Sequence, residues 1–324
     1  MPVPGPDPAL IDRFRRDLGL LVGEPKGSFA LAVSGGSDSL ALLLLSASAL
    51  PDQVAAATVD HGLRPESAGE AALVRRICGE LGVPHRTLTV TVEREGHGVQ
   101  AAARKARYAA LGGWMMAENM TTLLTAHHAD DQAETLLMRL NRGSGMGGLA
   151  GVRATGPLPG GDAQRLCRPL LSWRRETLAG IVRSSGLEPV EDPSNVDPAY
   201  DRARYRAALR HADWLDPAAL ARSAAWLGEG EEAIAWAAAR LAGERLQESG
   251  GGITLRSTDL PSELARRLVL ICLTRLEPEA APRGEALAAF VAMLRGGGVA
   301  TLGGVKGVGE GETWRFERAP PRRP

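Results

Sequence analysis

Four clusters of small and polar residues carry the side chains that could do chemistry. They are Ser34–Ser39, which reads Ser-Gly-Gly-Ser-Asp-Ser, Asp60–Gly62, His127–Asp131 and Glu191–Asn195. Each cluster comes just after a short apolar run that is typical of a strand. Because the carboxyl ends of parallel strands form the ligand crevice of an open α/β sheet, we expect all four clusters at one edge of one sheet.

The first cluster is typical of a loop that binds phosphate. Gly35 and Gly36 allow a tight turn that brings backbone N–H groups close to an anion, and the helix that follows presents its N-terminus to it. The carboxylate of Asp38 would repel a bound phosphate unless a cation bridges the two, and Mg²⁺ is the natural bridge. The GxxxxGK lysine of ordinary phosphate-loop kinases and GTPases is missing. A plain strand-to-helix turn with Ser and Asp caps stays open as the alternative.

Two carboxylates stand one helical turn apart in the segment that follows the fourth predicted strand. Asp131 and Glu134 share the helix face opposite a leucine-rich one. A pair at this spacing can jointly hold an ammonium group or a metal, whereas the alternative is a solvated acidic first turn. His127 and His128 precede the pair, but no zinc partner stands at a recognisable spacing, so we reject a zinc site.

Two arginines, Arg104 and Arg107, stand one turn apart on a predicted helix over 99–118. They could stabilise the charge of a phosphate or of a pyrophosphate leaving group. Taken alone, the pair is better explained as a solvated helix face.

The elements that must position these residues alternate between strand and helix patterns as far as residue 212. Strands are predicted over 29–33, 54–59, 85–92, 122–126 and 188–190, with helices over 39–50, 66–81, 99–118, 130–141 and 174–185. This alternation predicts an α/β fold, a doubly wound, mostly parallel, Rossmann-like sheet within residues 1–212. Residues 213–324 should form a smaller, mainly helical domain, with helices over 217–249, 261–276 and 284–294 and a hairpin over 296–318.

The composition excludes several classes of protein. Lys and Arg together number 38, as do Asp and Glu, so the net charge of zero does not announce a nucleic-acid partner. Three cysteines lie far apart, with no CxxC motif, which suits a reducing cytosol. The first residues are too polar and proline-rich for a targeting segment. No apolar run approaches the roughly 20 residues that span a bilayer, so we expect a soluble, cytoplasmic protein without a membrane partner.

Six further blocks narrow the interpretation. Ser34–Ser39 resembles the pyrophosphate loop (PP-loop) of the N-type ATP pyrophosphatases, and the whole series resembles the tRNA(Ile)-lysidine synthase family in the family's order over about residues 29–210. The blocks are Val59-Asp-His-Gly-Leu-Arg64, Ala103-Arg-Lys-Ala-Arg-Tyr108, Thr125-Ala-His-His-Ala-Asp-Asp-Gln-Ala-Glu-Thr135, Arg142-Gly-Ser-Gly-Met-Gly-Gly-Leu149, Arg168-Pro-Leu-Leu171 and Glu191-Asp-Pro-Ser-Asn195.

The resemblance implies a two-step reaction. O2 of the wobble cytidine of a tRNA(Ile) with a CAU anticodon attacks the α-phosphate of ATP, and pyrophosphate leaves. The ε-amine of free L-lysine then attacks C2 of the adenylated base and expels AMP. ATP and Mg²⁺ are the implied cofactors, and a homodimer is an expectation because members of the family often pair.

The resemblance also implies roles for individual residues. Asp38 would place Mg²⁺, Asp131 and Glu134 would bind the cationic groups of lysine, and His127 and Arg107 would act near the ATP and the cytidine. The phosphates of ATP would be held by Ser34, Gly35, Gly36, Ser37, Asp38 and Ser39. RNA phosphates would be contacted by Arg202, Arg204 and Arg206, although the family pattern Arg-Asn-Arg-Ile-Arg reads Arg-Ala-Arg-Tyr-Arg here.

Two other functions stay open on the sequence. One is another PP-loop enzyme such as a tRNA thiolase, which generally needs paired or catalytic cysteines. The other is a non-catalytic, ATP-dependent RNA-binding module. Lysine-dependent release of AMP in the presence of tRNA(Ile) would separate the synthase from both.

Overall fold

The computed structural model describes residues 3–24, 27–62, 67–91, 99–161, 163–190 and 201–320. Its contacts divide the chain into two units, Met1–Ser144 with Gly148–Trp226, and Gly145–Gly147 with Leu227–Pro324. The division falls inside helix α9 (Pro217–Arg245), some way beyond residue 212, where the sequence pattern changes. The functional division into residues 1–212 and 213–324 stays a prediction.

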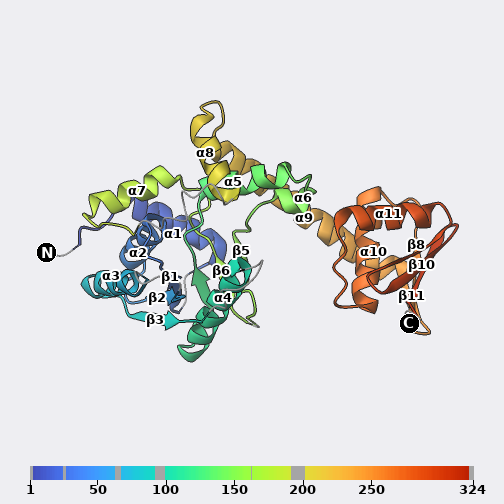
Figure 1. The fold of residues 1–324 in the computed structure, drawn as a ribbon, viewed down its shortest axis with the longest axis horizontal. Coiled ribbons are helices and arrows are strands. Elements are labelled where there is room, and N and C mark those ends of the chain that lie inside the picture. The colour runs from blue at the N-terminus through green and yellow to red at the C-terminus, as the bar shows by residue number, and fades with distance from the viewer. Residues whose placement is uncertain are drawn as a thin grey trace. The chain divides into compact units, whose positions relative to one another are not determined.

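The first unit is built on a six-stranded sheet with the order β3-β2-β1-β4-β6-β5 (Figure 1). Neighbouring strands from β3 to β6 pair in parallel, and β5 alone pairs antiparallel, with β6. The strands are β1 (Phe29–Ala32), β2 (Val54–Asp60), β3 (His85–Thr89), β4 (Thr122–Leu124), β5 (Thr155–Pro157) and β6 (Arg165–Cys167). The predicted α/β fold with a mostly parallel sheet is confirmed.

Helices cover both faces of this sheet. The helices of the first unit are α1 (Pro8–Val22), α2 (Ser37–Ala49), α3 (Ser67–Glu80), α4 (Val99–Ala117), α5 (Ala129–Leu140), α7 (Arg175–Ser184) and α8 (Asp201–His211), and the four-residue α6 (Met146–Leu149) lies at the division between the units.

Alternate strand residues point to opposite faces, which separates two apolar clusters. Phe29 and Leu31 of β1 belong to a cluster with side chains of α1, α2, α3 and α7. Ala30 of the same strand belongs to a second cluster, with Tyr108 and Met115 of α4. The sheet is therefore doubly wound, as predicted.

Helix α2 is buried on every side. All six residues of Leu40–Leu45 are at most 1% exposed, and α2 contacts α1, α7, β1 and β2. A helix that is apolar all round belongs in a core. The loop that precedes α2 is thereby fixed to the most deeply packed element of the first unit.

The strand predicted over 188–190 does not form. Residues 187–190 have no regular secondary structure, although the N–H of Val190 donates to the carbonyl oxygen of Gly35 at 2.9 Å. This hydrogen bond is made to the turn that follows β1 rather than to β1 itself, so residues 187–190 do not pair with the strand. The predicted functional cluster that follows, Glu191–Asn195, lies outside the described residues.

The second unit combines helices with a five-stranded antiparallel sheet of order β7-β8-β11-β10-β9. Its elements are the C-terminal part of α9, β7 (Leu246–Ser249), β8 (Gly252–Arg256), α10 (Ser262–Leu276), α11 (Gly284–Arg295), β9 (Val299–Leu302), β10 (Val305–Glu310) and β11 (Thr313–Arg318). The predicted C-terminal helices are present, but the sheet is larger than the single predicted hairpin. Helix α9 ends at Arg245, before the predicted 249, because Gly250 and Gly251 turn the chain with positive φ between β7 and β8.

No helix in the described parts of the chain combines the length and the apolar character needed to cross a membrane.

Candidate active site

The described clusters lie where parallel strands end. The phosphate-loop candidate follows β1, Asp60–Gly62 ends and follows β2, and His127–Asp131 follows β4 and opens α5. Since β1 pairs with both β2 and β4, the three clusters share the carboxyl edge of adjacent strands. The structure thus brings together the three predicted clusters that it describes.

The turn after β1 requires glycine at position 35. Gly35 has a φ of 88°, and a Cβ there would come within 2.9 Å of Cγ2 of Val190. The Oγ of Ser39 accepts from the N–H of Ser34 at 3.2 Å and donates to the carbonyl of Gly36 at 2.9 Å, which closes the turn. Gly36 caps α2 without a side chain, so no cap side chain competes with an anion for the first N–H groups of the helix.

The carboxylate of Asp38 joins the first cluster to the third. Its Oδ2 lies 3.3 Å from Nε2 of His128, whose side chain is almost fully buried. The Nδ1 of His128 accepts from the N–H of Asp131 at 3.4 Å, and Oδ2 of Asp131 accepts from the N–H of His128 at 3.1 Å, which forms a capping box on α5. With Nδ1 accepting, the neutral ring carries its proton on Nε2 and donates it to Asp38.

Burial by itself lowers the pKa of His128. The hydrogen bond to Asp38 and the charges of Asp131, Asp38 and Asp130 outweigh the burial, and they raise the pKa above its usual value.

One oxygen of Asp38 has the environment expected of a metal ligand. Its Oδ1 is buried and has no hydrogen-bond partner among the described residues. A buried carboxylate oxygen without a donor is costly, and a divalent cation would satisfy it. The described residues contain no group of three His, Cys, Asp or Glu side chains that could form a metal cage. Asp38 therefore has the chemistry of a single carboxylate ligand for Mg²⁺, an ion that usually keeps several of its waters when it binds to protein.

His127 is held as a neutral imidazole. Its Nδ1 lies 3.0 Å from Oγ1 of Thr125. Burial lowers the pKa of His127 to about 4, with Arg168, Arg202 and Arg107 acting in the same direction and Asp131 against it. At neutral pH the ring can therefore exchange hydrogen bonds without adding charge to the site.

The paired carboxylates of α5 are both occupied by arginines of α8. The Oδ1 of Asp131 accepts from Nη2 of Arg202 at 2.7 Å. The Oε2 of Glu134 accepts from Nε of Arg202 at 2.9 Å and from Nη2 of Arg206 at 3.2 Å, and its Oε1 accepts from Nε of Arg206 at 2.7 Å. Only 3% of the Glu134 side chain is exposed. We call these four residues the acid–arginine cluster.

The sequence did not predict that Asp131 and Glu134 pair with Arg202 and Arg206, because it assigned the first two to lysine and the others to RNA. The signal was available, since an arginine pair at i, i+4 matches a carboxylate pair at i, i+3 on a facing helix. The third arginine, Arg204, lies elsewhere on α8 and pairs with Asp201, which also accepts from Arg142 at 2.7 Å.

Arg107 belongs to a group of cationic and aromatic side chains on and beside α4. Arg104 and Arg107 lie over the ring of Tyr108, at 5.0 Å and 5.2 Å from its centroid. Arg107 also lowers the pKa of His61, after the larger effect of burial, so the charge of Arg107 reaches the end of β2 as well as His127. Arg168, which follows β6, is buried and donates through Nη1 to the carbonyl of Arg153 at 2.6 Å.

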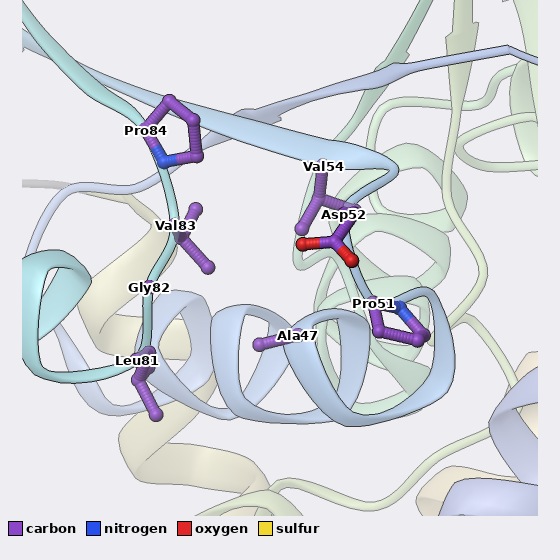
Figure 2. Close-up of a pocket in the computed structure, with 8 residues that line it drawn as sticks. All are labelled: Ala47, Pro51, Asp52, Val54, Leu81, Gly82, Val83 and Pro84. Carbon is purple, nitrogen blue, oxygen red and sulfur yellow. The ribbon is translucent and has the colours of Figure 1, made fainter.

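A hollow of about 270 Å³ lies at the other edge of the sheet (Figure 2). It is lined by Ala47, Pro51, Asp52, Val54, Leu81, Gly82, Val83 and Pro84. These residues come from the end of α2, the start of β2 and the turn before β3. Because the chemical groups gather at the carboxyl edge, this hollow is no part of the candidate site.

The amino-acid sequence of this chain is similar to those of known proteins. Residues 11–212 match the PP-loop domain family. The chain is 48% identical over 307 residues to a tRNA(Ile)-lysidine synthase of Zymomonas mobilis subsp. mobilis. The aligned region covers 94% of this chain and 92% of that protein. It is also 48% identical over 311 residues to a tRNA(Ile)-lysidine synthase of Novosphingobium aromaticivorans. Here the aligned region covers 96% of this chain and 94% of that protein.

A solved structure extends the likeness of the fold. The chain superposes on a U34-tRNA thiolase from Methanococcus maripaludis with a TM-score of 0.57 at 17% sequence identity, over 70% of this chain and 77% of that chain. At this level of identity the likeness shows the fold alone.

Proposed function

The chain belongs to the PP-loop family and to its tRNA(Ile)-lysidine synthases, and on this premise we propose that it ligates lysine to C2 of the wobble cytidine of a tRNA(Ile) with a CAU anticodon. The reaction consumes ATP and releases pyrophosphate and then AMP. The cytoplasm, where tRNA, ATP and free lysine occur together, is the proposed location. A homodimer remains a prediction from the family resemblance, and light scattering of the purified chain tests it.

The first step takes place at the start of α2. Ser34–Ser39 holds the phosphates of ATP through backbone N–H groups and hydroxyls, as the turn geometry and the uncapped helix N-terminus support. Asp38 would hold Mg²⁺ through its unpartnered oxygen, and the ion would supply positive charge to offset that of the departing pyrophosphate. O2 of the cytidine attacks the α-phosphate, and Arg107 stabilises the negative charge that develops.

The second step uses the start of α5. Asp131 and Glu134 bind the cationic groups of lysine, so that the ε-amine can attack C2 of the adenylated base. AMP leaves from C2, and the attacking nitrogen gives up a proton. Neutral His127, next to Asp131 in the site, is placed to accept a hydrogen bond from the amine or the base.

The RNA is bound in part by helix α8. It carries four arginines, Arg202, Arg204, Arg206 and Arg210, against one acidic residue, Asp201. Guanidinium groups bind phosphate oxygens with two parallel hydrogen bonds, which suits a helix that positions an RNA backbone.

The single observation that carries the proposal is the contact between Asp38 and His128. It ties the nucleotide loop to the helix that bears the carboxylate pair, so that adenylation and amine transfer share one site. The test is incubation of the chain with ATP, Mg²⁺, L-lysine and unmodified tRNA(Ile). The wobble cytidine should gain the mass of one lysine minus one water, and AMP should appear only when lysine and tRNA are both present.

The thiolase alternative is not favoured by the cysteines. Cys78, Cys167 and Cys272 are all free and buried, and burial raises their pKa values to about 12, about 11 and about 12. Cysteines that stay protonated and shielded from solvent are poor nucleophiles and poor metal ligands. Cys272 also belongs to the second unit, whereas the PP-loop belongs to the first.

A further inference from the structure

The acid–arginine cluster contains a conflict between two proposed roles. Asp131 and Glu134 are assigned to the cationic groups of lysine, yet Arg202 and Arg206 already neutralise them. Both oxygens of Glu134 accept from guanidinium groups, and its side chain is 3% exposed. An ammonium group would therefore have to displace charge-assisted hydrogen bonds from two carboxylates that are largely buried.

We propose that α8 is an exchangeable plug of the amine site: Arg202 and Arg206 occupy the place of the lysine ammonium until RNA phosphates take these arginines over. This inference rests on the proposed function. It concerns the order of binding, because free lysine reaches Asp131 and Glu134 only when the RNA has engaged α8.

The attachment of α8 supports an exchange. Ala203 is its one buried residue, Tyr205, Ala207 and Leu209 are partly buried, and no residue of α8 belongs to the apolar clusters of the first unit. Ion pairs between Arg202, Arg206 and the two carboxylates join it to α5. Figure 1 shows α8 lying beside α5. A helix held by such pairs can be released by a competing anion, whereas one held by an apolar face cannot.

The charges also balance in both states. Without RNA, two guanidinium groups meet two carboxylates inside the cluster. With RNA, the same guanidinium groups meet phosphates, and the carboxylates meet the amine substrate. Neither state leaves a buried charge unpaired, which would be the costly alternative.

Two guanidinium groups are suited to holding the site closed. A guanidinium presents several donors in a rigid fork, and Arg206 uses two of them to grip both oxygens of Glu134. Each ammonium group of free lysine presents its donors from a single nitrogen atom, so neither group can reproduce this two-point geometry. In the absence of tRNA, lysine should therefore not displace Arg202 and Arg206 from Asp131 and Glu134.

The test measures binding of L-lysine to the full chain by calorimetry, without ATP, with and without unmodified tRNA(Ile). In the wild type, tRNA should tighten lysine binding by about tenfold or more, because Arg202 and Arg206 would no longer compete with lysine for the two carboxylates. By linkage, saturating lysine should tighten tRNA binding by the same factor. Equal lysine affinity with and without tRNA would overturn the proposal.

A double variant supplies a gain of binding, which misfolding cannot imitate. Arg202→Gln with Arg206→Gln removes the plug but keeps a neutral donor near Glu134, so lysine should bind about tenfold or more tighter without tRNA, and tRNA should add little. The matched control is Arg75→Gln with Arg76→Gln, which removes two charges from helix α3 of the same unit and should keep wild-type lysine affinity. Arg206→Lys should lie between the wild type and the double variant.

The outcomes separate this inference from the proposed function. If the wild type modifies tRNA(Ile) but the double variant binds lysine no tighter than the wild type, the plug is wrong and the function stands. If the control gains as much lysine affinity as the double variant, a general loss of positive charge is the cause and the plug is again wrong. If the wild type transfers no lysine to tRNA, the proposed function itself fails.

Discussion

The Nε2 of His128 lies 3.3 Å from Oδ2 of Asp38, so the helix that follows β4 is tied to the helix that follows the neighbouring strand β1. This contact links two clusters that stand about ninety residues apart in the chain. Through the capping box it continues to Asp131, the first of the two carboxylates assigned to lysine. A change at either end should therefore affect both the nucleotide and the amine.

Asp38→Asn should abolish adenylation of tRNA. The amide keeps the shape of the side chain but loses the negative charge that would hold Mg²⁺ at the unpartnered oxygen. Release of pyrophosphate in the presence of tRNA(Ile) measures the step, with Asp52→Asn as the control at the opposite edge of the sheet. Adenylation of tRNA at the wild-type rate by Asp38→Asn would remove the metal role.

Glu134→Gln should weaken the use of lysine while tRNA-dependent release of pyrophosphate persists. The expected effect is a rise in the KM for lysine of about tenfold or more, because a charged partner of the amine becomes neutral. Glu231→Gln is the matched control, since Glu231 forms a similar pair with Arg267 at 2.7 Å in the second unit. An unchanged lysine dependence would exclude Glu134 from the amine site.

Gly35→Ala should impair both folding and the use of ATP. Alanine would be strained at a φ of 88°, and its Cβ would press on Val190, so we expect a loss of roughly 1–3 kcal/mol in the free energy of unfolding. Gly79→Ala is the control, because Gly79 lies inside helix α3 with open space around its Cβ position. That variant should be as stable as the wild type or slightly more stable. Urea titration of both variants checks the difference.

His127→Gln should change the response of stability to acid. The folded-state pKa of His127 is lowered to about 4, so between pH 6.5 and 4 the unfolded chain binds a proton that the folded chain does not. The wild type should therefore lose stability through this group as the pH falls through that window. At pH 5 the loss is about 2 kcal/mol relative to neutral pH, and the variant should lack it.

Urea unfolding at pH 7 and at pH 5 measures this difference. If wild type and His127→Gln lose the same free energy of unfolding between the two pH values, His127 is not held neutral.

Cys78→Ala and Cys167→Ala should each retain lysidine formation. Both side chains are at most 1% exposed and act as small apolar residues in the core beneath the sheet. The initial rate of lysine transfer to tRNA(Ile) is the measurement, after each variant has been shown to be folded. A folded variant that had lost turnover would place a thiol in the reaction and revive the thiolase alternative.

The sequence predicted the elements around the phosphate loop well, because the signals there are local. Short apolar runs that end in glycine and polar residues mark β1 and β4, and the topology of parallel sheets then places Asp38 and His128 at one edge. The convergence of the two clusters required only the order of the strands, whereas the contact between Asp38 and His128 was not predicted.

The pairing of Glu134 with Arg206 could not be obtained in the same way. The two residues are 72 positions apart, and their contact depends on how α8 lies on α5. On its own, Glu134 suits a lysine ammonium group and Arg206 suits an RNA phosphate. The sequence does not show which of the possible partners each side chain contacts. The C-terminal sheet was underestimated for a related reason, since β7 continues directly from a long alanine-rich helix and only the two glycines after it mark the turn.

The complete burial of Leu40–Leu45 affects the conformational entropy that the loop loses when it binds ATP. A loop anchored to a helix that is packed on every side is already in its working shape before ATP arrives, so little conformational entropy has to be given up on binding. The rearrangement that accompanies a catalytic cycle is then left to other parts of the molecule. Under the proposed function, the rigid helix α2 would serve the nucleotide, and selectivity would come from α8, the helix that we propose to contact the RNA.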